Sequence, residues 1–422
     1  MKRAKPSVIV AALAASALLV GACGSSSSPT SSGTTPTTGA ATAKATGAGK
    51  TNPTGAPILI GVISEENDPA GSFPEGREAI EAVTKYFNDT QNGIGGRPIV
   101  LKECTTTSAP EASQACANQM VQDHVVAVFD PSNLGEAAEV PVIDAAQIPD
   151  FAGGETTASY KAAYYIDWSS SLYGLAAAVL AVVKTKFNAT HIAFINIGNA
   201  GGIAAGKFLT AGLNKEGITV SEVDTPPTAT DYTSYVSVAQ SKHPQAVVVF
   251  QSKDGCLGVM KAASSLGLTV PIVGVPACMS GNALQVAGAA GDGWYSVQAG
   301  PFPTDTADPD TALFRSILTK YESTPTYGDA APYSFSSSYT LYKDVLEVLG
   351  PSNISAASIY QKAKAITTGH IVMGTNFFAC GTISVAPSIC GGAGEFLYQD
   401  KNGQAVDANA GQPIGADLTP VL

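Results

Sequence analysis

The sequence predicts an α/β fold with two lobes. Short runs rich in β-branched residues alternate with segments whose apolar residues recur at helical spacing. A β-α-β-α order of this kind implies parallel sheets that are covered by helices on both faces. The alternation begins near residue 58 and starts again after Trp168, and the chain beyond residue 57 is too long for one ordinary core. We therefore expect two lobes, each with its own parallel sheet.

The first lobe opens with an apolar strand at 58–64. An amphipathic helix follows at 75–88, with Ala79, Val83 and Phe87 on one face. A glycine-rich turn is expected at 92–96. Further strands are expected at 98–102, 125–129 and 149–152, with helices at 110–123 and 134–147.

The second lobe begins after Trp168 with a long apolar helix. Strands are expected at 191–197, 218–223, 246–250 and 270–275, and helices at 173–187, 203–217, 232–241 and 257–266. Two further helices are expected at 312–321 and 331–349, and the glycine-rich tail after Cys380 predicts hairpin and loop. We expect the chain to cross between lobes near 168–171, 296–300 and 349–354. The first lobe would then comprise 57–170 with 298–349, and the second lobe and tail 171–297 with 350–422.

The N-terminus has the pattern of an export signal. Basic residues among the first five precede an apolar run at 8–20, which is short for a membrane span. Small residues at 20–22 lead directly to Cys23, and the whole resembles a bacterial lipobox. Residues 1–22 are thus expected to be a signal peptide, with Cys23 acylated and the protein lipid-anchored on the extracytoplasmic face of the cell membrane. The alternative is an ordinary secretory signal beside a chance cysteine.

Residues 23–56 predict a disordered linker. From 24 onward they are almost wholly Gly, Ser, Thr, Ala and Pro. Such a composition buries too little apolar surface to offset the entropy of ordering.

The charge of the chain argues against two classes of partner. The formal net charge is −11, aromatic residues make up 7% of the chain, and Lys and Arg form no cluster. These features disfavour nucleic acid as a partner and direct binding to anionic lipid headgroups.

The cysteines agree with export. Apart from Cys23 they number six and fall as sequence neighbours, Cys104 with Cys116, Cys256 with Cys278, and Cys380 with Cys390. Sequence alone does not fix the connectivity, but we favour these local pairs because each would close a short loop between adjacent elements. A metal site is not expected, because there is no CxxC motif and the four histidines are scattered.

Several segments together carry a family resemblance. They are 57–63 followed by 93–102, 121–129, 231–236 with 244–249, and 398–403. In this order, after a lipobox, they resemble the leucine/isoleucine/valine-binding family of ABC-transporter substrate-binding lipoproteins over residues 57–405. The positions of Cys104/Cys116 and Cys380/Cys390 resemble those of actinobacterial members. The resemblance implies two Rossmann-like lobes with parallel sheets joined by hinge crossings, the type I periplasmic binding protein fold.

The resemblance also implies where a ligand would sit. Ligands of open α/β sheets lie beyond the carboxyl ends of the strands, and hinge closure between two lobes buries them. The family holds an amino-acid carboxylate with a Ser after the third strand and with backbone and hydroxyl groups after the fourth. The matching positions here are Ser132, Asn133, Ala152, Gly153 and Gly154. Residues 130–133 could equally form a turn and an N-cap for the next helix.

Strand ends of the second lobe supply the opposite wall of the expected site. Its candidate ligand-binding residues are Asn199, Gly201, Gly202, Lys253, Asp254 and Ala277. Many family members place an acid for the ligand ammonium where 274–278 has only Ala277 or Cys278, and an aromatic residue where 196–202 is small and polar. A neutral or differently charged small molecule is therefore an alternative to an α-amino acid.

The sequence offers little for catalysis. Residues 201–207 match a P-loop, but Phe208 stands where Ser or Thr would hold magnesium, so we interpret them as a glycine-rich strand-to-helix turn. Acids at 65, 66 and 68 follow the first strand, where a solvated loop is the simpler interpretation. Most of the aromatic residues at 164, 165, 168 and 173 are expected to pack at the hinge, and one of them could reach the ligand. There is no GxSxG or HExxH motif, and we expect no enzyme and no cofactor.

These observations predict an extracytoplasmic substrate-binding lipoprotein. It would capture a small polar metabolite, such as an amino acid or an amide, for the permease subunits of an ABC importer. A ligand-binding sensor module without transport is the alternative, and an exported enzyme is a more distant one.

Overall fold

The computed structural model describes residues 50–68, 72–107, 109–152, 159–169, 171–305, 307–325, 327, 330–392 and 394–415. The predicted signal peptide, Cys23 and most of the predicted linker lie outside these ranges. The linker ends earlier than the predicted residue 56. Thr51 donates its backbone N–H to the carbonyl of Asp89, and Gly55 donates to the carbonyl of Gly96. Residues 50–56 therefore belong to the folded part of the chain.

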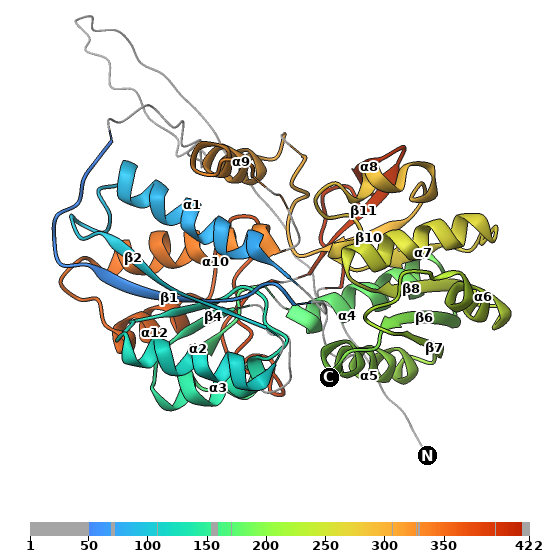
Figure 1. Ribbon diagram of the computed structural model, residues 1–422, viewed down its shortest axis with the longest axis horizontal. Helices are drawn as coiled ribbons and strands as arrows, with labels where there is room; N and C mark the ends of the chain where they lie inside the picture. Colours follow the sequence, from blue (N-terminus) through green and yellow to red (C-terminus); the bar gives the residue numbers. More distant parts are fainter. Residues whose placement is uncertain are drawn as a thin grey trace, which may run out of the picture. The chain divides into compact units, whose positions relative to one another are not determined.

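The first lobe is built on a five-stranded sheet in the order β2-β1-β3-β4-β5, with every neighbouring pair parallel. Its strands are β1 (Ile58–Glu65), β2 (Ile99–Thr106), β3 (Val128–Asp130), β4 (Asp150–Ala152) and β5 (Tyr165–Ile166). The first three helices are α1 (Pro74–Thr90), α2 (Pro110–Gln122) and α3 (Glu136–Ala145). Figure 1 shows α1 over one face of this sheet and α2 and α3 over the other.

Successive residues of β1 point to opposite faces of this sheet. Val62 packs in one core with Ile80 of α1, whereas Ile63 packs in another with Met120 of α2. Burial on both faces explains why residues 58–64 are apolar without alternation.

The chain returns to this lobe after leaving it. Four further helices are α9 (Pro309–Tyr321), α10 (Ala330–Thr340), α11 (Glu347–Leu349) and α12 (Ala356–Lys364), with a π-helical stretch at Leu341–Leu346 between α10 and α11. Helices α9, α10 and α12 pack on the core that contains Val62, to which they contribute Phe314, Phe335 and Ile359 respectively. Figure 1 shows α10 beside α1.

The second lobe is built on a seven-stranded sheet in the order β12-β11-β10-β9-β8-β6-β7. Its strands are β6 (His191–Ile197), β7 (Thr219–Thr225), β8 (Ala246–Phe250), β9 (Ile272–Gly274), β10 (Tyr295–Gln298), β11 (Phe396–Lys401) and β12 (Gln404–Asp407). Strands β6 to β10 pair in parallel, and β11 and β12 add an antiparallel hairpin. Asn402 and Gly403 at the hairpin tip both have positive φ, as a tight hairpin turn requires. The predicted hairpin in the tail is confirmed.

Helices cover both faces of the second sheet as well. They are α4 (Ser171–Ala181), continued by a π-helical turn at Val182–Lys186, α5 (Ala200–Lys215), α6 (Thr233–Ser241), α7 (Lys253–Ser265) and α8 (Ala283–Ala287). Phe194 of β6 packs with Leu209 of α5, whereas Ile195 packs with Val236 of α6. The expected fold class, two α/β lobes with largely parallel sheets, is confirmed.

Two of the three predicted crossings agree with the structure. The chain passes to the second lobe between β5 and α4, and it returns between β10 and α9. The prediction of a third crossing at 349–354, and of second-lobe packing for the residues that follow, is wrong. Ile359, Ala363 and Phe377 all lie in the core of the first lobe. The apolar stripe of α12 indicates that this helix is buried on one side but not which lobe covers it.

The third crossing instead lies in the loop between α12 and β11. Cys390 belongs to the core of the first lobe, while Ile383 and Ile389 belong to a core of the second. Asp167, at the first crossing, donates its N–H to the Ser388 carbonyl and accepts from the N–H of Cys390. The first and third crossings therefore lie side by side.

The described part of the chain contains three disulfides, and they are the three sequence-adjacent pairs that we favoured. Cys104–Cys116 joins β2 to α2, Cys256–Cys278 joins α7 to the turn after β9, and Cys380–Cys390 closes the loop of the third crossing.

Candidate ligand-binding site

The candidate residues follow the carboxyl ends of neighbouring strands in each lobe. Asp130 at the end of β3 pairs in register with Ala152 at the end of β4, so Ser132 and Ala152 lie at the same edge of the first sheet. Strands β6 and β8 are likewise neighbours, which places the starts of α5 and α7 at one edge of the second sheet. Gly153 and Gly154, also predicted to contact ligand, lie outside the described residues.

Buried side chains hold the loop after β3 in place through hydrogen bonds. The Asn133 Oδ1 atom accepts hydrogen bonds from the Gly135 N–H at 2.9 Å and from the Ser113 hydroxyl at 3.0 Å. Its Nδ2 donates to Glu139 at 2.6 Å, and Glu65 accepts from the Leu134 N–H at 2.7 Å. Asn133 is fully buried, so its side chain fixes the loop and is not placed to meet a ligand.

The alternative interpretation of this loop is correct in part. The contact from Asn133 Oδ1 to the N–H two residues later forms a turn. However, α3 begins at Glu136, and its N-cap, Gly135, provides no side-chain cap. Ser132 is 7% exposed and is the side chain of the pair that retains some access to solvent.

The glycine-rich turn after β6 is shaped by packing. Asn199 is the N-cap of α5, and its Oδ1 accepts from the Gly202 N–H at 2.7 Å. A Cβ on Gly202 would stand 2.2 Å from the Ile197 carbonyl oxygen, so only glycine fits there. Gly201 lies in the same first helical turn. The interpretation as a strand-to-helix turn accounts for these glycines without a phosphate.

Lys253 and Asp254 form the exposed first turn of α7, which Ser252 caps through the Gly255 N–H. Burial raises the pKa of Glu75, in the first turn of α1, and the nearby Lys253 ammonium opposes that rise. The two lobes therefore approach one another where α1 and α7 begin.

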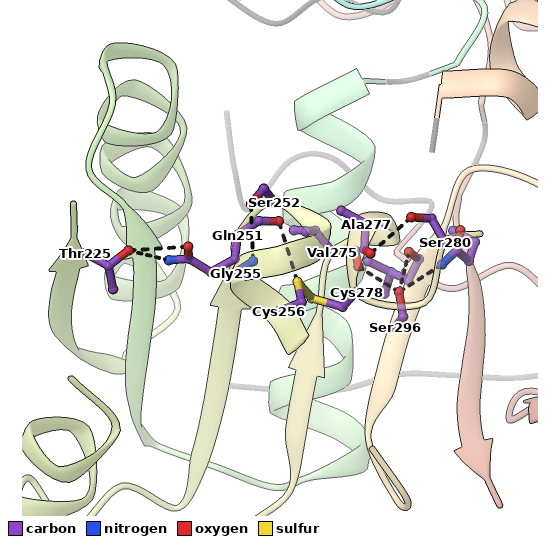
Figure 2. Close-up of a disulfide and its surroundings, with 12 residues drawn as sticks. Thr225, Gln251, Ser252, Gly255, Cys256, Val275, Ala277, Cys278, Ser280 and Ser296 are labelled. Atoms are coloured by element: carbon purple, nitrogen blue, oxygen red, sulfur yellow. Dashed lines mark hydrogen bonds between the residues drawn. A yellow bond between two sulfur atoms is a disulfide. The ribbon is translucent and has the colours of Figure 1, made fainter. Parts of the chain in front are cut away.

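A disulfide ties two strand ends of the second lobe together. Figure 2 shows Cys256, in the first turn of α7, bonded to Cys278 in the short turn Pro276–Cys278 after β9. The Ala277 carbonyl accepts from the Ser280 hydroxyl at 3.1 Å, and the Ala277 side chain packs in the core with 8% exposure. Ala277, predicted to contact ligand, therefore offers little of its side chain.

A small cavity of about 40 Å³ lies where the two lobes meet. The Gly281 N–H donates to the Tyr327 carbonyl at 3.3 Å beside it. Gln298 donates its Nε2 to Ser296 at 2.9 Å, which leaves its carbonyl oxygen available. The lining residues are Ser280, Gly281, Gln298, Phe302, Pro303, Thr304, Tyr327 and Pro332, and none is charged.

Comparison with protein families identifies the chain. A family model described as periplasmic binding protein matches residues 57–384.

This chain belongs to the periplasmic binding protein family.

Solved structures agree on the fold. A leucine-binding protein from Thermotoga maritima is 14% identical, with a TM-score of 0.68 over 83% of this chain and 97% of that one. A branched-chain amino acid transporter substrate-binding protein from Streptococcus pneumoniae, solved with isoleucine, is 17% identical, with a TM-score of 0.66 over 82% and 97%. A fatty acid ABC transporter substrate-binding protein from Thermomonospora curvata is 15% identical, with a TM-score of 0.70 over 87% and 95%. No curated protein matches the chain.

The interpretation of the acids at 65 and 66 as a solvated loop is wrong, because Glu65 is a buried residue at the end of β1 and Glu66 is ion-paired. Glu66 pairs with Arg77 at 2.7 Å. Glu65 is fully buried, and burial raises its pKa to about 7 although the Leu134 N–H lowers it. Among the residues that the structure describes, no group of His, Cys, Asp or Glu could hold a metal ion. Within the same ranges, no helix is long and apolar enough to cross a bilayer.

The aromatic residues near the first crossing pack as expected. Trp168 contacts Phe151 and Phe377, at centroid distances of 4.8 and 5.9 Å. Tyr173 packs against Tyr160 and Phe208.

Sequence reasoning missed the residues that line the cavity. Ser280, Gln298 and Tyr327 come from three separated segments. The only available signal was that residue 298 lies in the predicted crossing 296–300, since hinge strands border the space between lobes.

Proposed function

We propose that this periplasmic binding protein captures a small polar metabolite outside the cytoplasm and delivers it to an ABC importer. One observation carries the proposal. The uncharged cavity is lined from both lobes, beside the strand ends where α/β sheets bind ligands. Closure of the lobes over such a space would bury a ligand without any chemical step. Proteins of similar fold that are described as ABC transporter substrate-binding proteins support the assignment to transport.

The ligand that the site suits best has a neutral polar group. Lining residues supply hydroxyls and an amide, and the Gln298 carbonyl oxygen can accept from an N–H or O–H. The family resemblance puts Ala277 or Cys278 where many members carry an acid, so an ammonium group would lack that partner. Amides and related compounds are favoured, and amino acids remain within the proposed class.

We propose further that Cys23 carries a lipid that holds the protein on the cell membrane. The lipobox-like residues 20–23 and the linker after them support this. Cys23→Ser should release the protein to the medium or leave it unprocessed. Continued retention in the detergent phase would contradict the anchor without affecting the ligand proposal.

A thermal-shift screen of the purified full-length protein tests the binding function. Candidate ligands are amino acids, their amides, ureas, short carboxylates and a fatty acid. A ligand at about 100 times its dissociation constant stabilises the folded state by about 2.7 kcal/mol. We expect the largest shift from a neutral amide or urea, and Gln298→Ala should reduce that shift. A ligand that is chemically converted on incubation would contradict a pure binding function.

A further inference from the structure

A group of buried carboxyls lies beneath α3 in the first lobe. Glu136 and Glu139 of α3 are fully buried, and Asp150 of β4 is 2% exposed. Asp150 aligns in register with Val128 on one side and with Tyr165 on the other, so the three side chains point to the same face of the sheet. That face lies under α2 and α3, because Val128 packs with α2 residues and Tyr165 packs with Val140 of α3.

The carboxyls of α3 have specific partners. Glu136 accepts hydrogen bonds from the Ser159 hydroxyl at 2.9 Å and from the Tyr165 hydroxyl at 3.3 Å. Glu139 accepts from Asn133 Nδ2 at 2.6 Å.

Asp150 differs from the two acids of α3. Among the residues that the structure describes, neither of its carboxyl oxygens has a hydrogen-bond partner. A buried carboxylate without donors is costly, because water no longer solvates the charge. The protonated acid is neutral and avoids that cost.

The surroundings supply no compensating charge. Titratable groups facing Glu139 and Asp150 are Asp130 from β3, Glu136 from α3, and Tyr165 from β5, with Asp167 beyond it. The buried side chains of α2 are Ser113, Cys116, Ala117 and Met120. No Lys, Arg or His faces the group in the part of the chain that the structure describes. Burial first, and the neighbouring acids second, raise the pKa values of Glu139 and Asp150 well above their ordinary range.

We propose that Glu139 and Asp150 form a proton-binding site that holds the loop after β3 in place. In the protonated state the site is neutral, and Glu139 keeps its bond to Asn133, which in turn fixes Gly135 and Ser113. When the pH rises far enough, a proton leaves for solvent, and the remaining carboxylate faces Glu136 and Asp130. Repulsion among these acids then loosens α3 and the loop that carries Ser132.

Infrared spectroscopy of the full-length protein tests the protonation directly. Buried protonated carboxyls have a C=O stretching absorption separate from that of carboxylates. We expect this absorption to be present at about pH 7.5, where an ordinary Asp or Glu is ionised. Glu139→Gln and Asp150→Asn should each reduce it. The control Glu111→Gln, an exposed acid in the first turn of α2, should leave it unchanged.

Thermal melting from about pH 6 to about pH 9 tests the linkage, because groups with a raised folded-state pKa lose their stabilising effect as the pH rises. The melting temperature of the wild type should fall over this range. Either neutral variant should reduce the fall, since one of the ionisable groups that cause it has been removed. The Glu111→Gln variant should melt with the wild-type pH dependence.

Two results would overturn the proposal. One is the absence of the protonated-carboxyl absorption from the wild type at about pH 7.5. The other is a rise in melting temperature on adding Na⁺, Mg²⁺ or Ca²⁺ that disappears in Asp150→Asn, because the group would then hold a metal cation. Neither experiment requires a ligand, so the outcome is independent of the transport proposal.

Discussion

In the first lobe the loop after β3 is held by carboxyl groups, whereas in the second lobe the loops after β8 and β9 are held by a disulfide and by neutral caps. Glu65 and Glu139 bind the first-lobe loop. Cys256–Cys278 and Ser252 fix the second-lobe loops. Both sets of loops occupy the same position relative to their sheets. From this comparison we expect the first-lobe loop to respond to pH and the second-lobe loops to respond to the redox state.

Removal of the second-lobe disulfide should have the largest effect. Replacing Cys256 and Cys278 with Ser should lower the free energy of unfolding by about 3 kcal/mol, because the unfolded chain is no longer constrained. Urea unfolding measures the loss. The amides of 275–281 should also exchange faster with solvent.

The matched control is the Cys104→Ser, Cys116→Ser pair in the first lobe. It should also destabilise the protein but leave exchange at 275–281 unchanged. Equal exchange in both double variants would show that the disulfide does not hold this wall.

Glu65 should give the first wall a pH dependence. Its pKa is raised from 4.5 to about 7, mainly by burial. Because the folded-state pKa is the higher one, its stabilising contribution is full below about 4.5 and is lost as the pH rises through about 7. Glu65→Gln keeps an acceptor for the Leu134 N–H and should remove most of that loss. Denaturant unfolding at several pH values measures it, and a slope unchanged by the substitution would contradict the assignment.

Asn133 should matter more to stability than to recognition. Asn133→Ala leaves Glu139, Ser113 and Gly135 without their buried partner, which should cost about 2 kcal/mol. Urea unfolding measures this loss. A ligand found in the screen should bind folded Asn133→Ala more weakly only if the substitution displaces the loop after β3. An unchanged free energy of unfolding would show that the network is dispensable.

Asn199 should give the smallest effect. Asn199→Ala removes the side-chain cap of α5, which should cost about 1 kcal/mol at any pH where the protein is folded. Asn199→Asp retains an acceptor and serves as the control. A loss that varies with pH in Asn199→Ala would remove the contrast between the two lobes.

The order of strands and helices could be predicted from sequence because both sheets are buried on two faces. Residues 58–64 and 246–250 are largely apolar runs, as expected of strands that are buried on both faces. In the neighbouring helices the apolar residues recur at helical spacing. The packing partner of α12 could not be predicted in the same way. Its apolar stripe is equally compatible with either lobe, and the contacts that decide it come from residues distant in sequence.

The candidate site was predicted less well than the fold. Asn133 has the residue type of a ligand contact, but its burial comes from α2 and α3, which no local pattern reveals. The acids Glu139 and Asp150 also gave no signal, because a polar residue in a helix or strand normally indicates an exposed face. That residues such as Ser132 and Asn199 face one another across the two lobes remains a prediction.

The late third crossing affects the order in which the protein can fold during export. The first lobe requires Phe314, Phe335 and Ile359, so it cannot complete its core until most of the chain has emerged. The second lobe obtains five adjacent parallel strands from one continuous stretch, Ile192 to Val297, and later adds an edge hairpin and apolar residues of the third crossing. Because a chain that emerges from its N-terminus folds its continuous units first, we expect the second lobe to form early and to serve as the support on which the N-terminal lobe assembles.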